Sequence, residues 1–379
     1  MDNLLFVKKG VLLLFGWLIF LQNPTAAQDQ TESFTWINIK SLHVEGRGWE
    51  DEASFFRRLP ARAEGKVTAA VWNLSGHTSG MYVRFKTDAS SLKAKWSLTG
   101  ENLAMPHFAA TGVSGIDLYV KTQTGEWHWL AVGQPTKFPE NETTFFEGVT
   151  PEEREYLLYL PLYNGIDNLL IGVSGGASLE NAGMEEKKPI VFYGTSITQG
   201  GCASRAGMST TAILGRKLGR EIINLGFSGS GKMEPEMAYL LAELDPELFF
   251  IDCLPNLTAE EVRERVEPFV KILREKHPST PIILAEGVTY DNAFFVESRN
   301  QRNQESREAL RSAFENLMND GYRNLHYQIG EGQLGFDGEG TVDGTHPTDL
   351  GFYRQAQVYQ PLIENVLNSS GTSREKKAD

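Results

Sequence analysis

The chain has 379 residues, of which 41% are hydrophobic and 11% aromatic, and its formal net charge at pH 7 is −13. This length and composition predict a globular protein with one to three domains and substantial hydrophobic cores. The excess of acidic residues argues against a nucleic-acid-binding protein, and against attachment to an anionic membrane surface, because both need clustered Lys and Arg.

Residues 1–27 have the pattern of a secretory signal peptide. Lys8 and Lys9 precede an apolar segment at 10–21, and small residues follow at 25–27. The apolar segment is too short to span a bilayer comfortably, although an uncleaved membrane anchor is the alternative interpretation. We therefore expect an exported protein, secreted or periplasmic, without stable membrane insertion after cleavage.

Residues 28–178 predict an antiparallel β-sandwich domain. Short segments of alternating apolar and polar residues are separated by Gly, Asn and Ser, as in such domains. The candidate strands are 66–74, 80–87, 92–98, 115–122, 127–133, 154–163 and 168–174. Helical patterns are nearly absent from this part of the chain, so the predicted sandwich has few helices.

Residues 187–367 predict a second domain of the α/β class. Short strands that are apolar on both faces alternate with amphipathic helices, which is typical of a parallel sheet covered on both sides. The candidate strands are 189–194, 220–227, 247–252, 281–287 and 324–330, and the candidate helices are 208–219, 234–244, 258–275, 303–320 and 349–367. Thr258 and Glu261 have the spacing of a capping box. We expect a linker at 176–189 and a disordered tail at 368–379.

Polar residues follow several of these parallel strands. Ser196 follows the first, Gly229 the second and Asn256 the third, and Asp343 and His346 follow the fifth. Ligands of open parallel sheets bind outside the carboxyl ends of the strands, so these residues should meet at one edge. The sequence thus predicts a site that combines a hydroxyl, an amide, a carboxylate and an imidazole.

These residues are the parts of an acyl-transfer site. A serine hydroxyl becomes a good nucleophile when a base takes its proton, which His346 could do. Asp343, three residues earlier, could bond the other ring nitrogen and fix the tautomer. The backbone N–H groups of Ser196 and Gly229 and the amide of Asn256 could form an oxyanion hole. A side chain at position 229 would also block close approach of the substrate.

Each residue also has a simpler interpretation. Ser196 could cap a helix, Gly229 could mark a turn, and Asp343 and His346 could lie on the surface of a loop. Glu286 also ends a strand near this edge, and we interpret it as structural. All five residues in this order are what favours a catalytic site.

Four segments resemble the sequence blocks of the SGNH, or GDSL-type, hydrolases: GTSITQG (194–200), NLGFSGSG (224–231), DCLPN (252–256) and DGTHP (343–347). The departure is Thr195, where Asp commonly precedes the serine. The segment GIDLY (115–119) is similar to the signature of a β-sandwich domain that precedes some exported SGNH domains. The resemblance implies a flavodoxin-like three-layer α/β domain that hydrolyses esters or thioesters, often acetyl groups on sugars, with Ser196, His346 and Asp343 as the triad and Ser196, Gly229 and Asn256 as the oxyanion hole.

Two other classes of function have some support. Residues 226–233 differ from the sequence motif of a phosphate-binding loop at one position: Met233 stands where Ser or Thr would hold Mg²⁺. A non-catalytic carbohydrate-binding protein would use exposed tryptophans of the sandwich; the candidates are Trp72, Trp96, Trp127 and Trp129. Core packing is the simpler role for most of these rings.

Cys202 and Cys253 are the only cysteines. No spacing of Cys and His in the sequence fits a zinc site. The pair could be two buried thiols or a disulfide near the serine, because Cys202 lies six residues after Ser196 and Cys253 three before Asn256.

The sequence as a whole predicts a secreted serine esterase of SGNH type, without metal or organic cofactor. The expected substrate is a short acyl ester, in particular acetyl, on a small molecule or glycan. Lipid or other small esters, and acyl transfer to a hydroxyl instead of water, remain open. The sequence gives no prediction of oligomeric state.

Overall fold

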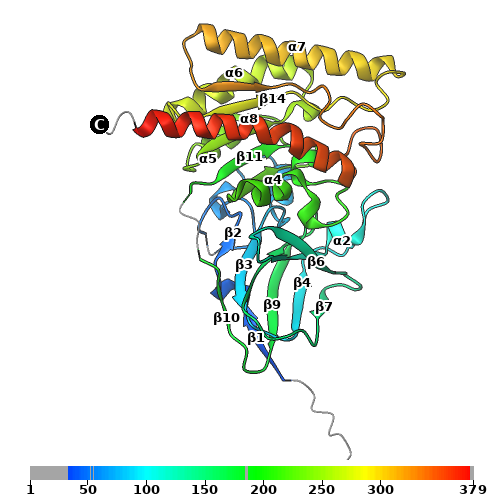
Figure 1. The fold of residues 1–379 in the computed structure, drawn as a ribbon. Helices are drawn as coiled ribbons and strands as arrows, with labels where there is room; N and C mark the ends of the chain where they lie inside the picture. The colour runs from blue at the N-terminus through cyan, green and yellow to red at the C-terminus, as the bar shows by residue number, and fades with distance from the viewer. Residues whose placement is uncertain (1–32, 52, 54, 184–186, 376–379) are drawn as a thin grey trace, which may run out of the picture. The chain divides into compact units, whose positions relative to one another are not determined.

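The computed structural model describes residues 33–51, 53, 55–183 and 187–375 (Figure 1). The predicted signal peptide at 1–27 lies outside the described residues. Within them, no helix combines the length and the apolar character that a membrane crossing requires.

The first half of the described chain forms two antiparallel sheets. One has the strand order β1-β9-β4-β7, and the other has the order β10-β3-β8-β5-β6 with β2 paired to β3. Their side chains meet in one core, which contains Phe85, Trp96, Ile116 and Ile171. The predicted sandwich is therefore confirmed. The bounds are β1 Phe34–Asn38, β2 Val44–Glu45, β3 Tyr82–Thr87, β4 Leu92–Leu98, β5 Ile116–Lys121, β6 Trp127–Gly133, β7 Glu140–Phe146, β8 Arg154–Tyr159, β9 Ile166–Ser174 and β10 Leu179–Asn181.

One predicted strand of the sandwich is wrong. The predicted strand at 66–74 is instead largely the helix α1 (Ala69–Ser75). Thr68 caps its first turn, because its hydroxyl accepts the backbone N–H of Val71. Val71 and Ser75 are its buried residues, and a spacing of four places them on one face of a helix. A second helix, α2 (Ala110–Val113), was also not predicted. Strand β10 lies in the predicted linker and extends the second sheet by pairing with β3.

The second half is built on five parallel strands in the order β12-β11-β13-β14-β15. Each observed strand lies inside a predicted one, and every residue of the first four is buried. This burial confirms the expectation of a sheet covered on both faces. The bounds are β11 Ile190–Gly194, β12 Ile222–Gly226, β13 Leu248–Asp252, β14 Ile282–Ala285 and β15 Leu325–Gln328.

Helices cover both faces of the parallel sheet, as Figure 1 shows. Val191 and Tyr193 of β11 pack in a core with α5, α6 and α7, whereas Ile190 and Phe192 pack in another core with α4 and α8. Alternate residues of a strand point to opposite faces, so this division confirms the three-layer α/β/α fold. The bounds are α3 Ser196–Gln199, α4 Thr210–Leu218, α5 Pro235–Leu241, α6 Ala259–Lys276, α7 Glu297–Asn319 and α8 Asp349–Glu375.

The predicted helices occur, with differences at two ends. The capping box of α6 is present, with reciprocal bonds between Thr258 and Glu261. Helix α7 begins at Glu297, six residues before the predicted start at 303. The prediction missed these residues because they are polar and Asn303 is the first buried residue of the helix. Helix α8 extends to Glu375, beyond the predicted helix end at 367.

The sandwich and the α/β part share a hydrophobic core. Tyr82, Phe108 and Tyr159 of the sandwich pack in the same cluster as Ile197 and Ala203, which follow the first parallel strand. The contact places the segment that begins at Ser196 directly against the sandwich.

The GIDLY segment forms the polar part of this contact. Asp117 is fully buried, and its Oδ2 accepts hydrogen bonds of 2.8 Å from Arg205 Nη1 and from the backbone N–H of Gly207. Its Oδ1 accepts a third bond from Trp129, and Arg205 also donates to the hydroxyl of Tyr119. The segment therefore anchors the loop that connects α3 to α4.

Asp252 is a buried carboxyl group at the end of β13. Burial raises its pKa to about 7, and hydrogen bonds from Tyr359 and Thr198 offset this only in part. In the unfolded chain an aspartate titrates near pH 4, so between about pH 4 and pH 7 the folded state keeps a proton that the unfolded state releases. The resulting penalty on stability is absent below this interval and complete above it.

We therefore expect Asp252→Asn to reduce the loss of stability on raising the pH from 4 to 7, by up to about 1.4 kcal/mol per pH unit. Urea unfolding followed at several pH values measures this slope. The matched control is Asp245→Asn, which neutralises an exposed carboxylate. Equal slopes for the wild type and Asp252→Asn would show that Asp252 is ionised in the folded protein.

Candidate active site

Ser196 is the first residue of α3, and only Thr195 separates it from the end of β11. Thr195 caps this short helix by accepting the backbone N–H of Ile197. The turn requires glycine at 194, because a Cβ there would lie 2.0 Å from the Thr198 hydroxyl. Gly200, with φ of +99°, ends the helix in the left-handed conformation. Ser196 is thus held on a tight strand-to-helix turn and is only 8% exposed.

The structure brings Ser196, His346 and Asp343 into one hydrogen-bonded relay. Ser196 Oγ lies 2.9 Å from His346 Nε2, and His346 Nδ1 lies 2.8 Å from Asp343 Oδ2. The backbone N–H groups of His346 and Thr345 donate to the other carboxylate oxygen at 2.8 and 3.0 Å. Partial burial would raise the pKa of Asp343, but these bonds and the His346 ring outweigh it and hold the pKa below its usual value. An ionised Asp343 can orient the ring and stabilise its protonated form.

The loop that carries Asp343 and His346 is closed on itself and braced from outside. Thr341 and Pro347 form an isolated antiparallel bridge, which includes a bond from Val342 N–H to the His346 carbonyl. Asp291 accepts the Thr341 hydroxyl at 2.7 Å, and Arg299 donates to the Thr345 hydroxyl at 3.1 Å. Neither brace was predicted, because Asp291, between β14 and α7, and Arg299, in the first turn of α7, belong to no sequence motif.

Gly229 lies in the turn that follows β12. The backbone N–H groups of Ser230 and Gly231 both donate to the Phe227 carbonyl, and Gly229 has φ of +67°. A Cβ at this position would meet nothing within 4 Å, so the conformation itself explains the glycine. The same open space leaves the backbone of the turn accessible.

Asn256 ends a short 3-10 helix, Leu254–Asn256, that follows β13. Its amide contacts the turn of Gly229 and can be oriented in two ways. With Nδ2 toward the turn it donates to Phe227 and Gly231 carbonyls at 3.4 and 3.3 Å. In the reverse orientation Oδ1 accepts from the N–H groups of Ser230 and Gly231, both at 3.2 Å, which satisfies the network better and frees Nδ2 to donate elsewhere. Since β12, β11 and β13 are neighbours, Gly229, Ser196 and Asn256 follow adjacent strand ends.

Two sandwich side chains hold helix α3, which begins at Ser196. His77 bonds the Gln199 amide at 3.0 Å, and Tyr163 donates to the Ser196 carbonyl at 3.1 Å. Gln199 in turn accepts the backbone N–H of Ser228, which precedes Gly229. Gln199, whose side chain is held by His77 of the sandwich, therefore connects the helix of Ser196 to the turn of Gly229.

The buried guanidinium of Arg58 holds the carboxyl end of β12. Arg58 of the sandwich is 1% exposed and donates to the carbonyls of Gly226, Asn224 and His77. Burial lowers its pKa to about 9, so the guanidinium is still charged at neutral pH. Sequence reasoning missed Arg58 because nothing in its neighbourhood marks it as buried.

Two other residues considered from the sequence, Glu286 and Lys232, form hydrogen bonds or ion pairs with neighbouring side chains and backbone. Glu286 is buried and accepts bonds from Arg311, Tyr327 and the N–H of Gly330. Lys232 of the segment resembling a phosphate-binding loop forms an ion pair with Glu261 at 3.6 Å. In the interactions of the described residues, neither side chain bonds Ser196, His346 or Asp343.

The disulfide considered from the sequence does not form, because Cys202 and Cys253 are free buried thiols. The two residues pack in the separate cores on either side of the parallel sheet. Burial, with a contribution from the charge of Asp343, raises the pKa of Cys202 to about 12. The thiol is therefore protonated at neutral pH and is a weak nucleophile.

The four tryptophans differ in exposure. Trp96 is fully buried in the sandwich core, and Trp129 is 48% exposed but bonded to Asp117. Trp72 stacks under Arg57, and Trp127 lines a cavity. They form no common stacking surface in the contacts that the described residues make.

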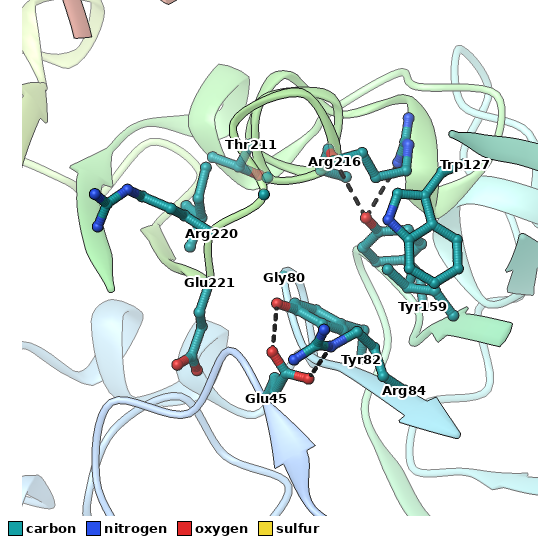
Figure 2. Close-up of a pocket in the computed structure, with 15 residues that line it drawn as sticks. Glu45, Gly80, Tyr82, Arg84, Trp127, Tyr159, Thr211, Arg216, Arg220 and Glu221 are labelled. Carbon is teal, nitrogen blue, oxygen red and sulfur yellow. Dashed lines mark hydrogen bonds and ion pairs between the residues drawn. The ribbon is translucent and has the colours of Figure 1, made fainter. Parts of the chain in front are cut away.

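The cavity beside Trp127 lies between β3, β8 and α4, and Figure 2 shows its lining. Its volume of about 40 Å³ has room for little more than a water molecule. Its polar side chains bond one another, with Glu45 accepting from Tyr82 and Arg84 and with Arg216 donating to Tyr159. No relay residue lines it, so it belongs to the domain contact.

The comparisons with known proteins agree with this architecture. The model of the GDSL-like lipase/acylhydrolase family matches residues 187–364, and the GxDLY model, described as the N-terminus of SGNH-hydrolase-type esterases, matches residues 34–179. No protein among those with curated functions matches the chain.

Three solved structures share the fold. A GDSL-like lipase from Bacteroides ovatus is 37% identical, with a TM-score of 0.85 over 89% of this chain and 98% of that one. The salicylyl-acyltransferase SsfX3 of a tetracycline biosynthetic pathway is 20% identical, with a TM-score of 0.72 over 88% and 97%. A family two carbohydrate esterase from Clostridium thermocellum, an active-site mutant in complex with celluohexase, is 14% identical, with a TM-score of 0.55 over 76% and 93%.

The likeness to the last two shows the fold alone, whereas the first match and the two family models show descent. The chain belongs to the GDSL-like lipase/acylhydrolase family, whose members are generally ester hydrolases, and carries the N-terminal GxDLY domain of the SGNH type.

Proposed function

We propose that this protein is an exported serine esterase that removes short acyl groups, in particular acetyl, from carbohydrate. The observation that carries the proposal is the relay of Ser196, His346 and Asp343, with both hydrogen bonds shorter than 3 Å. Export rests on the signal-peptide pattern of residues 1–27.

In the proposed reaction Ser196 Oγ attacks the acyl carbonyl carbon while His346 Nε2 takes the hydroxyl proton. The negative charge on the carbonyl oxygen is stabilised by the N–H groups of Ser196 and Gly229 and by the amide of Asn256. The tetrahedral intermediate then expels the alcohol, which receives the proton from His346. Water attacks the acyl-enzyme by the same route and restores Ser196, and Asp343 holds His346 Nδ1–H throughout.

The proposed carbohydrate substrate has two supports. One structural neighbour is a carbohydrate esterase, although that likeness concerns the fold alone. The other is a pocket of about 360 Å³ between the loops at 289–294 and 331–338. Asp291, which lines this pocket, also accepts the Thr341 hydroxyl and so braces the loop of Asp343 and His346.

Three aromatic rings stand at or beside this pocket with unusual exposure. Phe294, Phe295 and Phe336 are 90%, 85% and 84% exposed, which is rare for phenylalanine in a folded protein. Their faces offer apolar surface next to the loop that carries Asp343. Aromatic faces of this kind can stack on the rings of a glycan, so we assign this surface to the alcohol part of the substrate.

We expect Ser196→Ala to lower kcat for p-nitrophenyl acetate by at least about 10³-fold, because the nucleophile is lost. The matched control is Ser209→Ala, which truncates another buried serine that begins a helix outside the relay. Burst kinetics that detect an acyl-enzyme in the wild type complete the measurement. Unchanged turnover by Ser196→Ala would refute the assignment.

Asn256→Ala should lower kcat by about 10²-fold or more with little change in KM, because an oxyanion donor acts mainly in the transition state. Steady-state kinetics with the same ester measure both constants. Asn316→Ala removes an exposed amide from α7 and serves as the control. A variant with a raised KM and unchanged kcat would place Asn256 in ground-state binding instead.

The double variant Phe294→Ala/Phe336→Ala should lose more activity on an acetylated polysaccharide than on p-nitrophenyl acetate, since only the larger substrate reaches the rings. Acetate release and p-nitrophenol release, compared as a ratio, measure the effect. Tyr239→Ala removes an exposed ring from α5 as a control. An equal loss on both substrates would contradict the assignment, and a selective loss on long-chain lipid esters would favour a lipid substrate.

A further inference from the structure

His107 comes from the sandwich but lies at the relay. It stands on the loop between β4 and β5, where Met105 and Phe108 exchange two backbone hydrogen bonds of 3.0 Å across it. Phe108 is buried and packs edge-on against Tyr163, which fixes the loop. The His107 ring is exposed, and its centroid is 5.9 Å from that of His346.

Cys202 is held beside these two rings by an uncommon backbone conformation. Its φ is +77°, a value that residues other than glycine seldom adopt. The thiol is free, and its residue is 8% exposed. The sulfur and one nitrogen from each of His107 and His346 all lie within 4.8 Å of one another.

Two imidazole nitrogens and one cysteine sulfur are a ligand set that suits Zn²⁺. Bond lengths of about 2.0–2.3 Å place the ligands of a tetrahedral zinc roughly 3.5 Å apart, so the group needs to close by about 1 Å. The exposed His107 side chain can supply that movement, and a water molecule can take the fourth position.

The surroundings of His346 also fit a metal ligand. Its Nδ1 is bonded to Asp343 at 2.8 Å, which leaves Nε2 for the metal and reproduces the carboxylate–histidine–zinc arrangement. The same Nε2 is the atom that lies 2.9 Å from Ser196 Oγ. A metal bound there would occupy the lone pair that has to accept the serine proton.

We infer that His107, Cys202 and His346 form a Zn²⁺ site that blocks the relay when it is filled. Binding replaces the thiol proton of Cys202, which goes to solvent, and involves no change of oxidation state. The site joins one ligand from the sandwich to two from the α/β domain. Its inhibitory effect rests on the proposed esterase function, whereas its affinity for zinc does not.

The binding test uses Ser196→Ala, which lacks the nucleophile and keeps all three ligands. Competition with a chromophoric zinc chelator should show about one tight equivalent per chain. His107→Ala and Cys202→Ser, each added to Ser196→Ala, should weaken zinc binding by about 10-fold or more. His128→Ala, which removes an exposed histidine of β6, is the control and should have no effect.

Cobalt provides a readout specific to the sulfur ligand. Co²⁺ bound to Ser196→Ala should give a thiolate-to-metal charge-transfer absorption that Cys202→Ser abolishes and His128→Ala retains. Since His107 is exposed, its variant should fold even where replacement of Cys202 disturbs the backbone. Zinc affinity equal in Ser196→Ala and Ser196→Ala/His107→Ala, or cobalt binding without the sulfur band, would overturn the site.

The inhibition test uses the wild type with ZnCl₂ and p-nitrophenyl acetate. Zinc should inhibit, EDTA should restore the rate, and His107→Ala should need about 10-fold more zinc or more for half inhibition of its own zinc-free rate. Tight binding without inhibition would overturn the blocking of the relay. A zinc-free wild type without turnover would contradict the proposed esterase, and the binding and cobalt measurements would still decide on the site.

Discussion

The hydrogen bond between Ser196 Oγ and His346 Nε2 is the contact on which the candidate site depends. It joins residues 150 positions apart in the sequence. Ser196 is placed by the turn after β11, and His346 by the bridged loop before α8. Neither segment fixes the other locally, so the bond exists only because the parallel sheet brings both to the same edge.

The sheet achieves this through burial on both faces. Residues of β11 alternate between a core with α5, α6 and α7 and a core with α4 and α8. A slip of β11 by one residue would exchange these two sets and move Gly194 away from the position beside Thr198 where a Cβ would collide. Packing that has no part in chemistry therefore sets the position of the serine.

The sandwich is part of the site and not merely an appended domain. Tyr163 and His77 hold the segment of Ser196, and Arg58 holds the end of β12 through backbone carbonyls. Tyr163 and Arg58 donate to main-chain carbonyls, whereas His77 bonds the side-chain amide of Gln199. Geometry at the relay thus depends on the contact between the two domains.

Prediction from sequence succeeded where one-dimensional pattern and structure coincide. The five parallel strands were found because each is a short apolar segment followed by small or polar residues. Strand β7 was missed, since ENETTFF has little alternation of apolar and polar residues. Helix α1 was predicted as a strand because the apolar residues of KVTAAVWNL fit both the two-residue period of a strand and the period of a helix. The capping box of α6 could be predicted because Thr258 and Glu261 stand at the fixed three-residue spacing of this motif.

The five candidate site residues could be found because they follow strand ends in a family-like order. The supporting residues could not, and Arg58, Asp291, Arg299 and His107 are examples. Each acts by reaching across to a segment distant in the sequence, so its own neighbours carry no sign of the role.

The sequence by itself determined the fold class, the order of the strands along the chain and the chemical types of residue available at the sheet edge. Only the tertiary structure decided which of them meet: the relay of Ser196, His346 and Asp343, the free state of both cysteines, and the approach of Cys202 to two histidines from different domains. The reason is physical. Local propensity and periodicity fix elements over a few residues, whereas the distances that chemistry needs are set by how those elements pack.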